Sequence, residues 1–426
     1  MISMSVHTSE QLQRISSEAE MGNGQRPGSG QKKSGRRNQK DPLFHIVKRT
    51  DIPMWKSLLI RAGALIAALV VCAVIIVVIT GEDPFEMYKH MFNGSFKTPK
   101  KFWGMLQEMA ILLCISLAVT PAFKMRFWNI GAEGQVLMGG LGALMAMKLL
   151  GDDGLRLPNA VVLPMTIITA ILFGALWAVV PAIFKAQWNT NETLFTLMMN
   201  YIAIQIVRYI QIVWSGGSTA LRPINGTGSD PSYAGWLRLP AQIDPSFTGS
   251  VVVPSSSGYL LNILIVAALT VMVFLYMRYT KQGYELSVVG ESENTARYGG
   301  ISVKKVIIRT MLISGVLCGI AGLLIVAGTD HIINDGSAKG YGYTAIIVSW
   351  LAKFNPFYMV LTTFLVIFLK QGASELSTRT SGVITDDFSN ILIAIIILFI
   401  IGCEFFINYQ IKVRARQQKS KEAAES

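Results

Sequence analysis

The sequence predicts an all-α, polytopic membrane protein with about ten transmembrane helices and a re-entrant or broken helix in its second half. The first indication is composition: of 426 residues, 51% are hydrophobic and 15% are charged, and the mean hydropathy is +0.45. A soluble domain carries about 25% charged residues. The second indication is that apolar runs of about 20 residues recur along the chain. Together they exclude a soluble enzyme, a disordered scaffold and a nucleic-acid-binding module as the whole molecule.

Ten apolar segments are expected to lie in the membrane, because a bilayer core about 30 Å thick needs about 20 apolar residues per helix. The eighth segment is too short to cross, since Lys353 follows Tyr343 by only ten positions. It is therefore predicted to be a broken or re-entrant helix surrounded by protein. In chain order the ten segments are residues 57–80, 102–123, 127–147, 160–184, 193–214, 259–277, 306–328, 343–351, 357–369 and 388–408.

Two polar tails flank the predicted transmembrane domain, which comprises residues 57–408. Residues 1–56 begin with a long stretch rich in Ser, Gln, Gly, Lys and Arg, which cannot bury enough apolar surface to fold, so a disordered basic tail is expected. Residues 409–426 form the second tail. Because the first apolar run begins only near residue 57, it is expected to stay in the membrane as a helix and not to be a signal peptide.

The distribution of Lys and Arg predicts the orientation in the membrane. The net charge is +12, and the basic residues are concentrated in the tails and in the loops that would lie on the same side as both tails. Loops on the cytoplasmic side of a membrane carry the excess of Lys and Arg. An even number of spans with both termini in the cytoplasm is therefore expected, in the plasma membrane.

The residue types that support catalysis or metal binding do not cluster in the sequence. Cys72, Cys114, Cys318 and Cys403 each lie inside an apolar run, without metal-ligand spacing. The four histidines are far apart, and the sequence contains no Walker-type nucleotide-binding motif. We expect no enzymatic activity, no metal site and no cofactor, so that another protein has to supply any ATP hydrolysis.

The most informative segment is MRFWNIGAEGQVLMGGLG, residues 125–142, in which polar side chains open a membrane span. Asn129, Glu133 and Gln135 lie in this segment, and a charge at the centre of a membrane helix costs about 2.5–3.5 kcal/mol on insertion scales. Two interpretations stay open. Either these residues line a substrate pathway, or the glycines of the segment allow neighbouring helices to pack closely.

Three ordered motifs resemble the permease subunits of ABC importers, in the group that handles branched-chain amino acids, simple sugars and nucleosides. They are NIGAEGQ at 129–135, NETLFTLMMNYIA at 191–203 and YELSVVGESENTARYGGISV at 284–303. With the later stretch GYTAIIVSWLAKFNPF, the resemblance covers about residues 103–408. It implies a permease domain that pairs with a second permease, as a heterodimer, and couples to a cytoplasmic ABC ATPase. It also implies an extracytoplasmic substrate-binding protein.

The loop 279–305 is similar to the coupling helix with which such permeases dock to their ATPase. Ser292 is placed to cap a short helix that Gly299 and Gly300 end. A plain solvated loop is the alternative. By resemblance, the residues that contact the ATPase are Glu291, Glu293, Asn294, Arg297 and Tyr298.

The candidate substrate pathway combines the polar residues of the NIGAEGQ segment with nearby ionisable and aromatic side chains. Glu108 lies within the second span, where a charge is a functional-site hypothesis by default. Phe127 and Trp128 are placed to stack on a base, or to anchor the helix at the interface. The outer loop that enters the short eighth span contains residues 336–342 with Asp330, His331 and Asp335, and broken helices often carry substrate groups in transporters. The second long loop, residues 215–258, is expected on the outer side.

The NIGAEGQ form is closer to nucleoside permeases than to other members of the group, so an ATP-driven nucleoside importer is the leading interpretation. A simple-sugar importer is the runner-up. A gradient-driven secondary transporter remains as an alternative from another class, although the spans hold few of the Asp, Glu and His residues that a proton relay needs. A scaffold that recruits partners through its basic tail is the third hypothesis.

Overall fold

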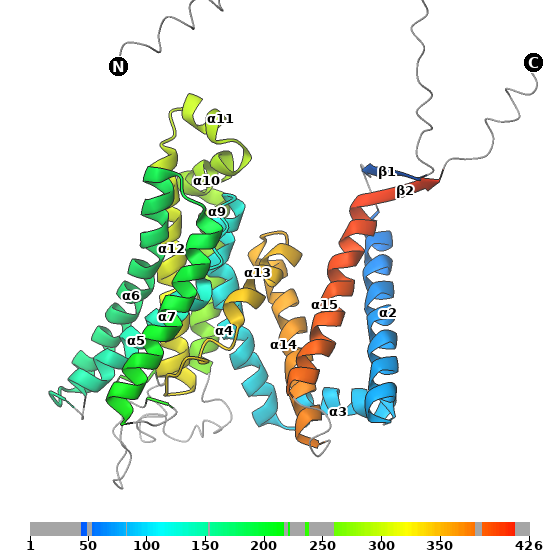
Figure 1. Cartoon of the computed structure of the whole chain (residues 1–426), viewed down its shortest axis with the longest axis horizontal. Coiled ribbons are helices and arrows are strands. Elements are labelled where there is room, and N and C mark those ends of the chain that lie inside the picture. The colour runs from blue at the N-terminus through cyan, green and yellow to red at the C-terminus, as the bar shows by residue number, and fades with distance from the viewer. Residues whose placement is uncertain are drawn as a thin grey trace, which may run out of the picture. The chain divides into compact units, whose positions relative to one another are not determined.

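The computed structural model describes residues 44–48, 53–81, 83–151, 154–216, 220–221, 235–237, 260–379 and 386–413. The chain divides into two units, Asp51–Asn408 and a smaller one formed by Met1–Thr50 with Tyr409–Ser426. The described part of the larger unit is almost entirely helical, which confirms the predicted all-α membrane fold (Figure 1). The expected tails at 1–43 and 414–426, and most of the expected loop 215–258, lie outside the described residues.

Ten helices correspond in order to the ten predicted segments. Most of them extend beyond the predicted segments at one or both ends, because polar and proline residues at helix ends are compatible with helix geometry. The third segment differs: it was predicted to begin at Phe127, and its helix begins only at Ala132. The helices are α2 (Met54–Thr80), α4 (Pro99–Lys124), α5 (Ala132–Leu150), α6 (Asn159–Trp188), α7 (Glu192–Ser215), α9 (Leu260–Tyr279), α12 (Val303–Leu323) continued by the π-helix η3 (Leu324–Thr329), α13 (Tyr341–Leu351), α14 (Pro356–Arg379) and α15 (Asp386–Asn408).

Seven of these helices, counted over the described ranges, are long and apolar enough to cross a membrane: α2, α4, α6, α7, α9, α12 with η3, and α14. The short eighth segment is confirmed, since α13 has only 11 residues. It begins inside the protein, where Tyr341 and Gly342 are buried. Within the described ranges, three further helices lie outside the ten segments: α3 (Pro84–Phe96), α10 (Lys281–Glu291) and α11 (Glu293–Tyr298).

The centre of the larger unit is the packing of α12 against α4, α5 and α6. Close approach depends on glycine: a Cβ on Gly319 of α12 would lie 2.5 Å from the backbone oxygen of Ala170 in α6. Gly315, one turn earlier, faces the backbone of Gly174. This is the small-residue packing typical of membrane helices.

A second apolar cluster joins the first helices of the membrane domain to its last helices. α2 packs against α15, and α3 packs against α14. Ala68, Cys72 and Ile76 of α2 are buried in this cluster with Leu392 and Ile396 of α15. The start of α3 is fixed by Asp83, whose carboxylate accepts a 2.9 Å hydrogen bond from the backbone N–H of Phe85.

The smaller unit contains an antiparallel pair of strands, β1 (Phe44–Lys48) and β2 (Tyr409–Val413), in which Phe44 lies opposite Val413. The expectation of a disordered tail over 1–56 differs from the structure at β1, and the tail 409–426 begins with β2. In β2, Tyr409, Ile411 and Val413 alternate with polar residues, which is the period of a strand. A composition averaged over the whole tail conceals this short pattern.

Candidate functional site

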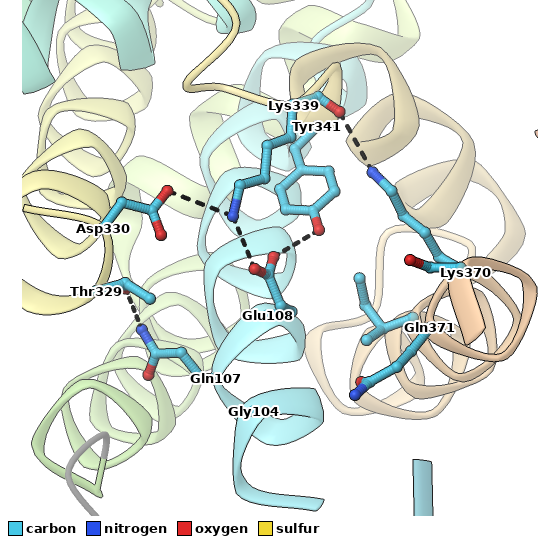
Figure 2. Close-up of a pocket in the computed structure, with 11 residues that line it drawn as sticks. Gly104, Gln107, Glu108, Thr329, Asp330, Lys339, Tyr341, Lys370 and Gln371 are labelled. Atoms are coloured by element: carbon cyan, nitrogen blue, oxygen red, sulfur yellow. Dashed lines mark hydrogen bonds and ion pairs between the residues drawn. The ribbon is translucent and has the colours of Figure 1, made fainter. Parts of the chain in front are cut away.

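A cavity of about 470 Å³ lies between α4, the end of η3, the start of α13 and α14 (Figure 2). Its volume falls in the range of about 300–1,000 Å³ that is usual for small-molecule sites. Its wall is formed by Gly104, Gln107, Glu108, Thr329, Asp330, Lys339, Tyr341, Ile367, Lys370, Gln371 and Ser374.

Helical spacing brings these side chains to the cavity. On α4, Gly104, Gln107 and Glu108 are separated by three and four positions, so they share one face. On α14, Lys370 and Gln371 follow Ile367 by three and four positions and share a face in the same way. The cavity is therefore a meeting of two polar helix faces with the connecting segment 330–340.

A cluster of charged side chains crosses the cavity and joins these elements. The Lys339 Nζ atom lies 2.7 Å from Glu108 Oε1 and 3.4 Å from Asp330 Oδ2. The hydroxyl of Tyr341 donates a 2.6 Å hydrogen bond to the other Glu108 oxygen. The Lys370 Nζ atom donates to the Lys339 backbone carbonyl at 3.4 Å and lies 4.2 Å from the Tyr341 ring centroid. Figure 2 shows this network around Glu108.

The start of α13 is stabilised by a residue of the NIGAEGQ segment. The two carboxylate oxygens of Glu133, in α5, accept hydrogen bonds from the backbone N–H groups of Gly340 (2.9 Å) and Gly342 (2.7 Å). The first N–H groups of a helix have no partner within the helix, and a negative charge there is favourable. Glu133 therefore allows a short helix to begin inside the protein.

The other polar residues of that segment form a buried network between helices. The Asn129 amide donates to Ser314 Oγ of α12 at 3.2 Å, and the Gln135 amide donates to Asn129 Oδ1 at 3.2 Å. Asn129 is fully buried and Gln135 is 1% exposed. Neither residue is in the cavity wall, so the structure places them among packed helices.

The two aromatic candidates lie in different surroundings. Phe127 is 3% exposed and packs in an apolar cluster with Leu286 and Val289 of α10. Trp128 is 43% exposed, and its ring centroid lies 5.5 Å from that of Trp350. Of the six residues predicted for the substrate pathway, Glu108 alone is in the wall of the cavity described above. The pathway role of the other five stays a prediction.

The residues predicted to contact the ATPase belong to α10 and α11, which follow one another in the chain (Figure 1). Tyr298 is 94% exposed. The predicted capping is confirmed, because the Ser292 hydroxyl accepts a hydrogen bond from the backbone N–H of Thr295. All five predicted contact residues are exposed: Glu291, Glu293, Asn294, Arg297 and Tyr298.

The same short helices are firmly attached to the membrane domain. Leu286 and Ala296 are fully buried in an apolar cluster that includes Val306 and Ile307 of α12. Arg309 of α12 lies 3.0 Å from Glu285 of α10. The helices α10 and α11 therefore carry exposed polar side chains on one side and are packed against α12 on the other.

Sequence reasoning did not find most of the cavity. Lys370 and Gln371 interrupt an apolar run at helical spacing, which is a weak signal of a polar face. Lys339 gave no such signal, since its partner Glu108 lies 231 positions away. Asp330 was singled out only as part of the segment before the short helix.

The comparison with protein families matches residues 103–401 to the family described as the branched-chain amino acid transport system permease component. A guanosine ABC transporter permease protein of Bacillus subtilis is 31% identical over 345 residues, which cover 80% of this chain and 92% of that protein. A glucose ABC transporter permease protein of Haloferax volcanii is 28% identical over 368 residues, covering 86% and 92%. A nucleoside ABC transporter permease protein of Lactococcus lactis is 24% identical over 352 residues, covering 82% and 92%.

No solved structure matches the chain significantly. The family match covers more than half of the chain, and the relatives are aligned over most of their own length. The chain therefore belongs to the branched-chain amino acid transport system permease family and is a membrane-spanning ABC transporter permease, a transport component and not an enzyme.

Proposed function

We propose that the chain is the permease subunit of an ATP-driven importer of nucleosides. The observation that carries this proposal is the likeness to the guanosine permease of Bacillus subtilis, at 31% identity over 92% of that protein. The nucleoside permease of Lactococcus lactis supports the same substrate class. The polar cavity provides a place where a small hydrophilic molecule would be held during passage.

The proposed partners follow from the role of a permease. A separate ABC ATPase docks on α10 and α11 through Glu291, Glu293, Asn294, Arg297 and Tyr298, and a substrate-binding protein delivers the nucleoside on the other side. A second, related permease completes the pathway as a heterodimer. Both termini and the α10–α11 surface face the cytoplasm, and the membrane is the plasma membrane.

The connection between the docking surface and the cavity supports this assignment. α12 begins next to α11, is tied to α10 through Arg309 and Glu285, and continues through η3 to Thr329 and Asp330 in the cavity wall. A rigid element that touches both sites is the kind of element whose displacement couples them. Movement of α11 by the ATPase is thus transmitted to the cavity through α12.

For the substrate pathway, we assign direct contact to Glu108 and indirect roles to the residues of the NIGAEGQ segment. Glu133, Asn129 and Gln135 position α13 and α12 by their buried hydrogen bonds. Phe127 and Trp128 support the α10 junction and the C-terminal half of α13, respectively.

A simple-sugar importer is the second candidate, because the glucose permease of Haloferax volcanii is 28% identical over 92% of its own length. The gradient-driven transporter, the alternative from another class, does not agree with membership of an ABC permease family. The transported substrate therefore separates the two remaining candidates.

The test is uptake of labelled guanosine and labelled glucose in cells with and without the gene for this chain. Each assay is repeated after ATP depletion and after collapse of the proton gradient. ATP-dependent guanosine uptake that disappears without the chain is the expected result. Loss of glucose uptake alone would favour the sugar importer, and uptake that follows the proton gradient would contradict an ABC mechanism.

A further inference from the structure

Two carbonyl oxygens in the cavity wall are buried and have no hydrogen-bond partner among the described residues. They are the side-chain Oε1 atoms of Gln107, on α4, and Gln371, on α14. Gln107 is 1% exposed. Buried polar atoms in proteins are almost always paired, so two unpaired acceptors on one wall require an explanation.

The surroundings of Gln107 determine which amide atom is left over. The Thr329 hydroxyl donates its hydrogen to the backbone carbonyl of Leu324 at 2.9 Å. Because the single hydrogen of the Thr329 hydroxyl is used in this way, the hydroxyl oxygen acts as an acceptor for Gln107. The amide N–H of Gln107 donates to it at 2.5 Å. The unpaired atom of Gln107 is its carbonyl oxygen.

The same reasoning fixes the orientation of Gln371. Its amide nitrogen donates to the backbone carbonyls of Gly94 (3.4 Å) and Lys101 (3.3 Å). Backbone carbonyls only accept hydrogen bonds, so the amide cannot be reversed without losing both contacts. Gln371 also presents an unpaired carbonyl oxygen.

The charges of the wall indicate an uncharged ligand. Two carboxylates, Glu108 and Asp330, and two ammonium groups, Lys339 and Lys370, line the cavity, so their formal charges cancel. Lys339 is engaged by both carboxylates, and one oxygen of Glu108 also accepts from Tyr341. Beyond these pairs the wall offers the two Gln carbonyl oxygens as acceptors and the Lys370 ammonium group, which over the described ranges contacts only the Lys339 carbonyl and the Tyr341 ring, as a donor. The hydroxyl groups of an uncharged ligand can donate to the former and accept from the latter.

We propose that the cavity binds the hydroxylated sugar ring of the transported molecule, with Gln107 Oε1 and Gln371 Oε1 accepting hydrogen bonds from its hydroxyl groups. The proposal rests on the proposed function and names the part of the substrate that the permease itself recognises. It assigns recognition to the ring that a nucleoside and a simple sugar have in common, and not to the base.

The test uses the complete importer in proteoliposomes, with guanosine and 2′,3′-dideoxyguanosine as substrates. The dideoxy compound keeps the base and lacks two hydroxyl groups. Wild type is expected to transport guanosine about tenfold faster, since a lost partner leaves a buried acceptor unpaired. Gln107→Met keeps the side-chain volume, removes the carbonyl and is expected to reduce this preference to about threefold or less.

Thr329→Val is the matched control, because it breaks the same Gln107–Thr329 hydrogen bond and leaves the Gln107 carbonyl in place. It is expected to keep the preference. The binding protein is identical in all preparations, so its own selectivity cancels when variants are compared. If Gln107→Met does not assemble, Gln371→Met applies the same test from α14.

The outcomes separate the two levels of the proposal. Equal transport of both substrates by wild type overturns the sugar site and leaves the nucleoside importer standing. An unchanged preference in the Gln→Met variant, or an equal loss in Thr329→Val, also overturns the site. Transport of neither substrate contradicts the proposed nucleoside function itself.

Discussion

Glu133 of α5 accepts a 2.7 Å hydrogen bond from the backbone N–H of Gly342, 209 positions later in the chain. Its other carboxylate oxygen accepts from Gly340. The acidic residue of the NIGAEGQ segment thus serves as the N-terminal cap of a short helix in the second half of the protein. The contact connects the two halves at the depth where α13 begins.

Replacing Glu133 by alanine is expected to lower transport strongly while the protein still inserts. The change leaves the buried N–H group of Gly342 and the partly buried N–H group of Gly340 without partners, and a buried group left unpaired costs about 1–3 kcal/mol. Glu133→Gln keeps one acceptor and should retain more activity. Guanosine uptake, normalised to the amount of protein in the membrane, measures the effect. Equal uptake by Glu133→Ala and wild type would contradict a functional role for the cap.

Gly342→Ala is expected to destabilise the protein by about 1–3 kcal/mol, the usual cost of an overpacked site. A Cβ at Gly342 would collide with the backbone of Glu133, which cannot move aside as a flexible side chain does. Gly336→Ala in the preceding segment is the control, because the nearest atom to its Cβ is 3.6 Å away. Thermal denaturation of the purified protein in detergent compares the two variants. If the two variants had similar thermal denaturation midpoints, the start of α13 would be able to move away from Glu133 without loss of stability, which would contradict the prediction.

The order of the membrane helices was predictable because it depends on local properties. The lengths of apolar runs gave ten helices in sequence, and the brevity of the eighth followed from Lys353. The cap of α11 followed from Ser292, since capping involves residues three positions apart. The helix α3 lies outside the ten segments because its polar and aromatic residues do not form an apolar run.

The cavity was only partly predictable, because it is assembled from segments far apart in the chain. Glu108 was recognisable as a charge within a span. The role of Lys339 could not be predicted, because it depends on a contact with Glu108 that only the three-dimensional structure shows. The sequence also did not distinguish a pathway residue from a helix cap at Glu133. That distinction depends on where Gly340 and Gly342 lie in three dimensions.

The Glu108–Lys339 pair is expected to show energetic coupling in a double-mutant cycle. Glu108→Gln leaves Lys339 near Asp330 alone, and Lys339→Met leaves Glu108 with Tyr341 alone. Each single variant should lower the thermal midpoint, and the double variant should lower it by less than the sum. Contacting residues typically show coupling of about 0.5–3 kcal/mol. Additive shifts would mean that the 2.7 Å contact contributes little to stability.

The docking surface gives the last prediction, that Arg297→Glu uncouples transport without unfolding the permease. Arg297 is exposed, and its 3.6 Å pair with Glu293 is a surface i,i+4 pair worth only about 0.3–0.5 kcal/mol, so the variant should insert and assemble normally. Substrate-stimulated ATP hydrolysis by the purified complex is expected to fall at least about tenfold, the effect of losing about 1.4 kcal/mol of docking energy. Lys97→Glu, an exposed charge reversal just after α3, serves as the control and should keep wild-type hydrolysis. Full stimulation of ATP hydrolysis in Arg297→Glu would contradict the prediction that α11 contacts the ATPase. An equal loss of hydrolysis in Arg297→Glu and Lys97→Glu would indicate a general effect of surface charge.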